Sequence, residues 1–306
     1  MPLVPENELL LAAEKGQYAV PGLFPFDLDL IKVIIDAAEE EKSPVIILQG
    51  PEFIKDFGVE LFTAAVKSAA HAAKVPVAIA VDHTFRIDDS TFDSLMMCLH
   101  HGWQSIMIDC SLLPYEENVR RTKEIARICH AAGVACVGAL GEVKRFFPGV
   151  KEDTEFYQEG FVVPEELMTD PIQAKEYVER TGVDTLAISV GQYVRSLWEK
   201  ETLPVKRVAR LDFERIRQIR DATSAHLILH GSTYVSKDDL TKSTEYGISE
   251  IKAATEYGFI WATEVRKTLD NDPELMFPID IQKPALAKVK EAMIDYMRIF
   301  KSSGKA

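Results

Sequence analysis

The chain has 306 residues, 47% of them hydrophobic, which is enough for one large core. Its formal net charge is -13 at pH 7, and because an acidic chain repels phosphate backbones and anionic lipid, nucleic acid and membranes are not expected partners. The N-terminus lacks the basic segment of a signal peptide, and no apolar run approaches the roughly 20 residues of a spanning helix. Four scattered cysteines without a CxxC pair favour reduced thiols and a cytoplasmic location.

Short apolar runs alternate with longer amphipathic stretches along the whole chain. The predicted strands are Tyr18–Phe24, Val45–Gln49, Val75–Asp82, Ser105–Asp109, Val134–Leu140, Thr185–Val190, His226–His230 and Ile248–Ala253. The predicted helices between them are Asp29–Lys42, Gly58–Lys74, Asp88–His101, Tyr115–Ala132, Pro171–Thr181, Asp212–Thr223 and Lys237–Tyr246. Eight such units predict an α/β fold, the closed (β/α)8 TIM barrel. A doubly wound open sheet is the alternative, although no Gly-rich dinucleotide fingerprint follows the first strand.

We expect a single domain over residues 1–306, because no linker rich in Gly, Ser or Pro divides the chain. A C-terminal helix is predicted at about 284–301. A long βα loop at about 141–170 stands out, since most such loops are much shorter. It follows a predicted strand on the catalytic side of the barrel, where long loops serve as lids or binding loops.

Polar residues at the ends of predicted strands indicate the active site. Asp82 and His83 end the run VAIAVDH, and His230 ends LILH on another strand. In a TIM barrel both ends open onto the same C-terminal mouth, where active sites lie. Histidine there can ligate a metal, and a neighbouring aspartate can move protons. The alternative for Asp82 is a helix cap.

Two further strand ends carry groups suited to an anionic substrate. Gly231, Ser232 and Thr233 follow His230 and can present backbone N–H groups and hydroxyls, or simply begin a helix. Lys252 lies near the end of the last strand. It can act as a cation for phosphate, as a Schiff-base amine, or as an ordinary ion-paired lysine.

At these residues the sequence resembles the class II, metal-dependent fructose-1,6-bisphosphate and tagatose-1,6-bisphosphate aldolases. The resemblance runs over most of the chain and includes YAVPGLFPFDLD, VPVAIAVDH, GWQSIMIDCSLLPYEENVRRTKEIARICHAAGV and LILHGST. It implies a TIM barrel that cleaves a phosphorylated ketose and releases a unit similar to dihydroxyacetone phosphate. It also implies a small phosphorylated sugar as ligand, a divalent metal, usually zinc, and a homo-oligomer.

Carried over by position, the resemblance assigns roles to individual residues. Asp82 would be the acid/base, and His83 and His230 metal ligands. The residues that would lie at the substrate or its phosphate are Asp109, Ser111, Gly191, Gly231, Ser232, Thr233 and Thr255.

The chain also departs from the family pattern. Val194 stands where the family has its third metal-binding histidine, and Lys252 where it has a substrate-contacting asparagine. The family's Gly after the metal-binding histidine is Thr84, and its glutamate on the fifth strand is missing. Catalytic zinc takes three protein ligands, and the candidates to complete the set are Asp82, Cys110, Glu142 and Gln192.

Three hypotheses follow from this pattern. The first is an aldolase-type carbon–carbon lyase with altered metal dependence. The second is a metal-independent enzyme on the same barrel in which Lys252 serves as Schiff-base amine or anion clamp. The third is an aldolase-like binding protein that has lost the chemistry.

Overall fold

The computed structural model describes residues 3–51, 54, 58–84, 89–143, 145–146, 162–195, 207 and 209–306. Within these ranges eight parallel strands close into a barrel in the order β1-β10-β9-β7-β5-β4-β3-β2. They are β1 (Val20–Leu23), β2 (Val45–Gln49), β3 (Val77–Val81), β4 (Ser105–Met107), β5 (Ala135–Leu140), β7 (Thr185–Ile188), β9 (His226–Leu229) and β10 (Ile248–Ala253). The predicted TIM barrel is confirmed, and the open-sheet alternative is wrong.

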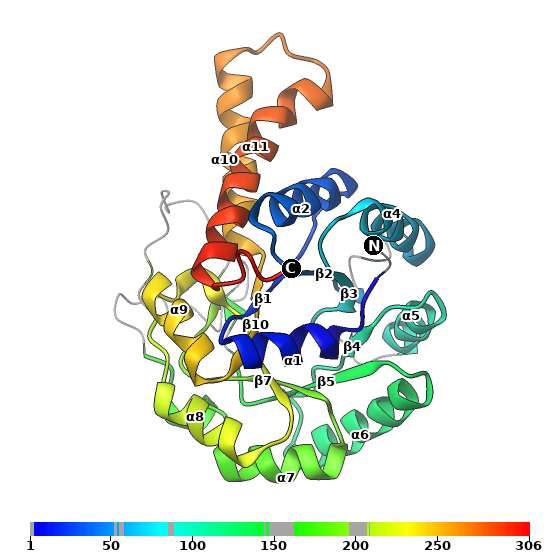
Figure 1. The fold of residues 1–306 in the computed structure, drawn as a ribbon, viewed down its shortest axis with the longest axis vertical. Coiled ribbons are helices and arrows are strands. Elements are labelled where there is room, and N and C mark those ends of the chain that lie inside the picture. The colour runs from blue at the N-terminus through cyan, green and yellow to red at the C-terminus, as the bar shows by residue number, and fades with distance from the viewer. Residues whose placement is uncertain are drawn as a thin grey trace.

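Helices surround the barrel, as Figure 1 shows. They are α2 (Leu28–Glu41), α4 (Val59–Ala72), α5 (Asp89–His100), α6 (Tyr115–Ala131), α7 (Pro171–Thr181), α8 (Phe213–Ala222) and α9 (Lys237–Tyr246). Several begin at a capping side chain: Asp27, Asp170, Asp212 and Ser236 each accept a hydrogen bond from a backbone N–H of the first turn. Because these capping residues can be recognised in the sequence, the predicted starts of these four helices lie within one residue of the observed starts.

Two helices were not predicted from the sequence, α1 near the N-terminus and α10 near the C-terminus. The helix α1 (Glu6–Gly16) crosses the barrel in Figure 1 and packs against β1, β3, β9 and β10. After β10, α10 (Thr255–Asn271) and α11 (Pro278–Ile299) form an antiparallel arm that projects from the barrel. The predicted C-terminal helix therefore starts too late. Pro284 lies inside α11, and a proline normally marks a helix boundary.

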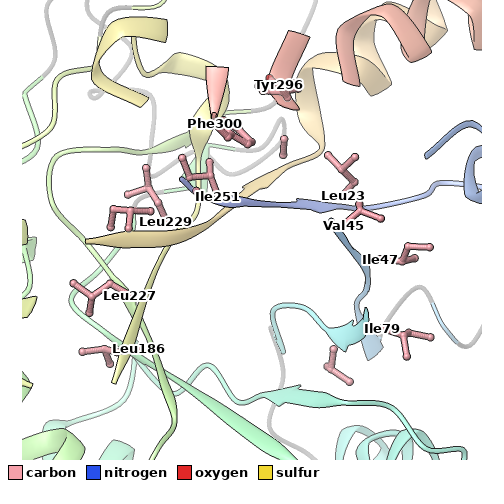
Figure 2. Packing of buried hydrophobic residues seen from close by; sticks show 14 of the residues in the cluster. Leu23, Val45, Ile47, Ile79, Leu186, Leu227, Leu229, Ile251, Tyr296 and Phe300 are labelled. Atoms are coloured by element: carbon pink, nitrogen blue, oxygen red, sulfur yellow. The ribbon is translucent and has the colours of Figure 1, made fainter. Parts of the chain in front are cut away.

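The core has two layers because side chains alternate along each strand. The outer layer packs the strands against the surrounding helices. Figure 2 shows part of it, including Leu23, Ile47, Ile79, Leu186, Leu227, Leu229 and Ile251 with Tyr296 and Phe300. The inner layer fills the barrel and includes Val20, Ile46, Leu48, Ala78, Ala80, Met107, Val137, Ala139, Ala187 and Ile228. Its many alanines leave room for larger polar side chains in the interior.

Most of the long loop predicted at about 141–170 lies outside the described residues. A small parallel sheet of β6 (Arg145–Phe146) and β8 (Val194–Arg195) stands where β5 and β7 lead out of the barrel. No helix in the ranges given above is both long and apolar enough to cross a bilayer. The single-domain organisation stays a prediction.

Candidate active site

Three side chains with metal-binding atoms meet at the mouth of the barrel. Asp82 and His83 follow β3, and His230 follows β9 on the opposite side of the ring. Their potential ligand atoms all lie within 4.8 Å of one another. The imidazole centroids of His83 and His230 are 3.8 Å apart, and His230 Nδ1 lies 3.9 Å from Asp82 Oδ1. The structure thus brings together the residues that the two strand-end motifs singled out.

Asp109 and Ser111 fix the orientation of His83. The ring Nδ1 of His83 lies 2.8 Å from Asp109 Oδ2. The backbone N–H and hydroxyl of Ser111 donate to Asp109 Oδ1 over 3.1 and 2.6 Å, and the Asp109 N–H donates to Thr84 Oγ1 over 2.8 Å. Since Nδ1 is engaged, Nε2 is the atom of His83 that would ligate a metal. A carboxylate behind a ligating imidazole is the usual second partner in metal sites.

Lys252 extends from β10 toward the same cluster. Its ammonium lies 3.1 Å from Asp82 Oδ1 and 3.8 Å from Met107 Sδ, and the residue is only 6% exposed. Burial alone would lower the pKa of Lys252, but Asp82, Glu250 and Glu6 together raise it. Burial would likewise raise the pKa of Asp82, but Lys252 and His83 hold it below its usual value. The pair is therefore an ammonium beside a carboxylate.

The structure also narrows the choice of a third metal ligand. A Cβ placed on Gly231 would lie 3.3 Å from Val194 Cγ2, so a valine methyl group stands beside the strand end that carries His230. The amide of Gln192 is engaged with the backbone, since it accepts from Val190 N and donates to the carbonyl of Ile188. Within the described ranges, Asp82 is the residue found clustered with the two histidines.

The predicted phosphate-site residues gather at the ends of the neighbouring strands β9 and β10. Gly231 has a φ of 72° and precedes the short helix η3 (Ser232–Tyr234). The Ser232 hydroxyl donates to the Lys252 carbonyl over 2.8 Å, so it links the two strand ends. Thr255 is the first residue of α10, whose N-cap residue makes no side-chain cap. A helix N-terminus of this kind attracts anions.

Gly191 follows β7, and the conformation of the backbone there requires a glycine. Its φ is 111°, and a Cβ there would come 2.3 Å from the Arg210 carbonyl oxygen. Only glycine accepts this conformation at such a close approach. This packing fixes where the segment after β7 leaves the barrel.

A sequence profile described as fructose-bisphosphate aldolase class-II matches residues 4–305. The chain belongs to this family. Similar curated proteins include the probable fructose-bisphosphate aldolase of Bacillus subtilis (strain 168), 36% identical over 310 residues with both chains covered completely. The fructose-bisphosphate aldolase of Geobacillus stearothermophilus is 34% identical over 315 residues, covering 100% of this chain and 99% of its relative.

Solved structures agree with this assignment. The YdjI aldolase from Escherichia coli K12 matches with a TM-score of 0.77 at 29% identity, and 99% of each chain is covered. The resemblance to class II aldolases is therefore confirmed, and this family member is an aldolase of the lyase class.

Two charged residues near the candidate site, Arg207 and Glu250, could not be singled out from the sequence. Arg207 donates to the carbonyls of Ser232 and Val235 over 3.0 and 3.1 Å and pairs with Glu256, which holds η3 against α10. No motif surrounds Arg207 in the sequence. Glu250 was overlooked for a different reason. It lies inside a strand, two residues before Lys252, and only the strand period could have shown that both side chains face the interior.

Proposed function

We propose that this class II aldolase cleaves a phosphorylated ketose in a reversible aldol reaction and releases a unit similar to dihydroxyacetone phosphate. The observation that carries the proposal is the meeting of Asp82, His83, His230 and Lys252 at one barrel mouth. Such a cleavage needs a base for a hydroxyl proton, positive charge near the carbonyl oxygen and a site for phosphate. The mouth offers a candidate for each.

Asp82 is the proposed acid/base. As the carbon–carbon bond breaks, its carboxylate accepts the proton of the substrate hydroxyl, and in the condensation direction it returns that proton. The lowered pKa of Asp82 keeps the carboxylate ready to accept. Its position beside Lys252 also fixes the direction in which the carboxylate points.

His83 and His230 are the proposed metal ligands, with one carboxylate oxygen of Asp82 as the nearest third donor and the other left to exchange the substrate proton. Two imidazoles and a carboxylate form a donor set that zinc accepts, and Asp109 orients His83 from behind. The residues present therefore fit a divalent metal even though Val194 replaces a histidine. When bound, zinc would polarise the substrate carbonyl as a Lewis acid.

Lys252 is proposed to act as a cation rather than as a Schiff-base amine. Schiff-base formation needs a neutral amine. The Lys252 side chain instead lies 3.1 Å from the Asp82 carboxylate, with Glu250 and Glu6 adding to the negative field. A fixed ammonium here would attract the negative charge that develops on the substrate oxygen and would help to bind an anionic sugar phosphate.

The proposed phosphate site is formed by the N-terminus of α10 at Thr255 and by the backbone of Gly231, Ser232 and Thr233. The Ser232 hydroxyl is already used to bind the Lys252 carbonyl, so the contribution of that residue would come from its N–H group. Gly191 is proposed to face the same ligand. A homo-oligomer remains our expectation from the family resemblance, and a cytoplasmic location our expectation from the scattered cysteines.

The test is an aldol-cleavage assay on a panel of ketose mono- and bisphosphates, with triose phosphate release as the readout. Wild-type protein with added zinc should turn over, and Asp82→Asn should lower kcat by roughly a hundredfold or more. Asp93→Asn is the matched control, because Asp93 is an exposed carboxylate on the helix that follows the same strand. Absence of turnover on the whole panel, with zinc, cobalt and manganese each supplied, would refute the proposal and favour a binding protein.

The role of Lys252 is tested separately by borohydride reduction in the presence of substrate. A cationic role predicts no covalent adduct by intact mass. An adduct on wild type that is lost in Lys252→Met would show the Schiff-base route instead.

A further inference from the structure

An arginine links the two elements of the proposed phosphate site. The guanidinium of Arg207 donates from Nη1 to the carbonyls of Ser232 and Val235, over 3.0 and 3.1 Å, and so binds the first residue of η3 and the residue that follows it. Its Nη2 pairs with the carboxylate of Glu256, in the first turn of α10. One nearly buried cation therefore sets the spacing between η3 and the start of α10.

The bond to the Ser232 carbonyl also acts on the neighbouring N–H group. In a trans peptide the carbonyl oxygen and the N–H group point in opposite directions. The N–H of Thr233, which belongs to the same peptide as the Ser232 carbonyl, therefore points away from the guanidinium. A cation on the carbonyl side polarises the peptide and makes its N–H a stronger donor. Arg207 thus strengthens one of the backbone groups proposed to bind phosphate.

Glu256 is the residue of this site that would oppose an anion. It follows Thr255 in the first turn of α10, where the backbone N–H groups have no intrahelical acceptor. A free carboxylate there would itself occupy the positive end of the helix dipole and would repel a phosphate. In the structure the carboxylate is held by Arg207 and by the hydroxyl of Tyr296 from α11. Burial and Glu256 raise the pKa of Tyr296, so the phenol keeps its proton and donates it to that bond.

The contacts of Arg207 require the shape of an arginine as well as its charge. Its Nη2 also lies 3.4 Å from the Tyr296 hydroxyl, and its Cζ lies 5.8 Å from the centroid of the Tyr296 ring. The planar fork thus binds two carbonyls, a carboxylate and an aromatic ring at once. A lysine would offer a single flexible ammonium in its place.

We propose that Arg207 is a positioning residue that sets the affinity of this site for the phosphate of the sugar substrate. It does so by neutralising Glu256, by polarising the Thr233 N–H and by fixing η3 against α10. This inference rests on the proposed function, because the phosphate monoester is the ligand named there. In a chain with a formal net charge of -13, a phosphate dianion needs such local compensation of negative charge.

The test measures the affinity for inorganic phosphate, from the concentration dependence of the rise in Tm over chloride at equal ionic strength, and so needs no turnover. Arg207→Met frees the Glu256 carboxylate and should weaken phosphate binding about tenfold. Glu256→Gln removes the repelling charge, leaves that of Arg207 uncompensated and should tighten binding by about threefold or more. The double variant should return to within about threefold of wild type. A purely structural role for the pair predicts weaker binding in all three variants.

The opposite signs of the two single variants decide the result. Weaker binding in Glu256→Gln would overturn the proposal even if Arg207→Met fails to fold. Wild-type affinity in Arg207→Met would also overturn it, as would a double variant no tighter than Arg207→Met, or a wild-type protein that binds no phosphate. Arg217→Met and Glu214→Gln disrupt an exposed pair on α8 and should leave phosphate affinity unchanged.

The cleavage assay separates this inference from the proposed function. Arg207→Met should raise KM for a ketose phosphate about tenfold and leave kcat within about threefold of wild type, because the lost interaction is made equally in the ground state and the transition state. A fall in kcat with KM unchanged would contradict the role of Arg207. A wild-type protein that binds phosphate but cleaves no ketose phosphate would refute the proposed function and leave the phosphate-binding role of Arg207 standing.

Discussion

Replacing Lys252 by methionine tests the electrostatic arrangement of the barrel interior most directly. Methionine keeps most of the aliphatic volume but removes the ammonium that faces Asp82, Glu250 and Glu6. All three carboxyls are buried or nearly so, and the closest, Asp82 Oδ1, lies 3.1 Å from the ammonium. The variant therefore leaves buried acids without their nearest cation.

The size of the effect follows from that loss. Removing one partner of a buried ion pair costs about 3–5 kcal/mol, because the remaining charge stays desolvated. For a chain of this length each kcal/mol lowers Tm by about 2 °C, so we expect a drop of about 6–10 °C at pH 8. Lys252→Arg, which retains the charge, should lose much less than the methionine variant.

The dependence on pH separates lost charge from lost packing. Without Lys252, burial, the largest influence on Asp82, is opposed only by His83, and we expect it to raise the pKa of Asp82 above its unfolded value. The folded variant then binds a proton that the unfolded chain releases. The stability of the variant therefore falls as pH rises above about 4, and its deficit relative to wild type shrinks on acidification. Urea denaturation of both proteins at pH 5 and at pH 8 measures the difference in free energy of unfolding between wild type and variant at each pH. A deficit equal at both pH values would show that packing, and not charge, is what Lys252 contributes.

Three further substitutions test the mouth of the barrel. Asp109→Asn removes the carboxylate behind His83 and should weaken zinc binding about 10- to 100-fold in chelator competition, while an unchanged affinity would deny it that role. Val194→His restores an imidazole beside the strand end of His230 and should tighten zinc binding by at least about tenfold; no gain would mean that the position is outside ligand reach. Gly191→Ala should lower the free energy of unfolding by about 1–3 kcal/mol, because its Cβ meets the Arg210 carbonyl at 2.3 Å. Wild-type stability in this variant would contradict the steric argument.

The barrel was predictable because its strands are buried on both faces and read as continuous apolar runs, such as VAIAV before Asp82. The ends of those runs placed Asp82, His83 and His230 at one mouth. Their meeting required only that strand ends of a closed parallel barrel face the same way.

The contacts around these residues were not predictable in the same way. The bond from His83 to Asp109 and the ion pair from Lys252 to Asp82 join residues 26 and 170 positions apart. Nothing in the local sequence sets such distances. The start of α11 was misplaced for a local reason, because Pro284 is tolerated inside a helix where the sequence indicates a boundary.

The helix α1 has a consequence for the order in which the molecule folds. It is made before every strand of the barrel, yet it packs against β10, which is the last of those strands to be made. The N–H of Ala19, just after this helix, donates to the carbonyl of Phe300 over 2.9 Å. Contacts of such long sequence separation form late because the intervening chain must first be ordered. The helix α1 should therefore dock among the last elements, and it should seal the barrel floor only after the ring of strands has closed.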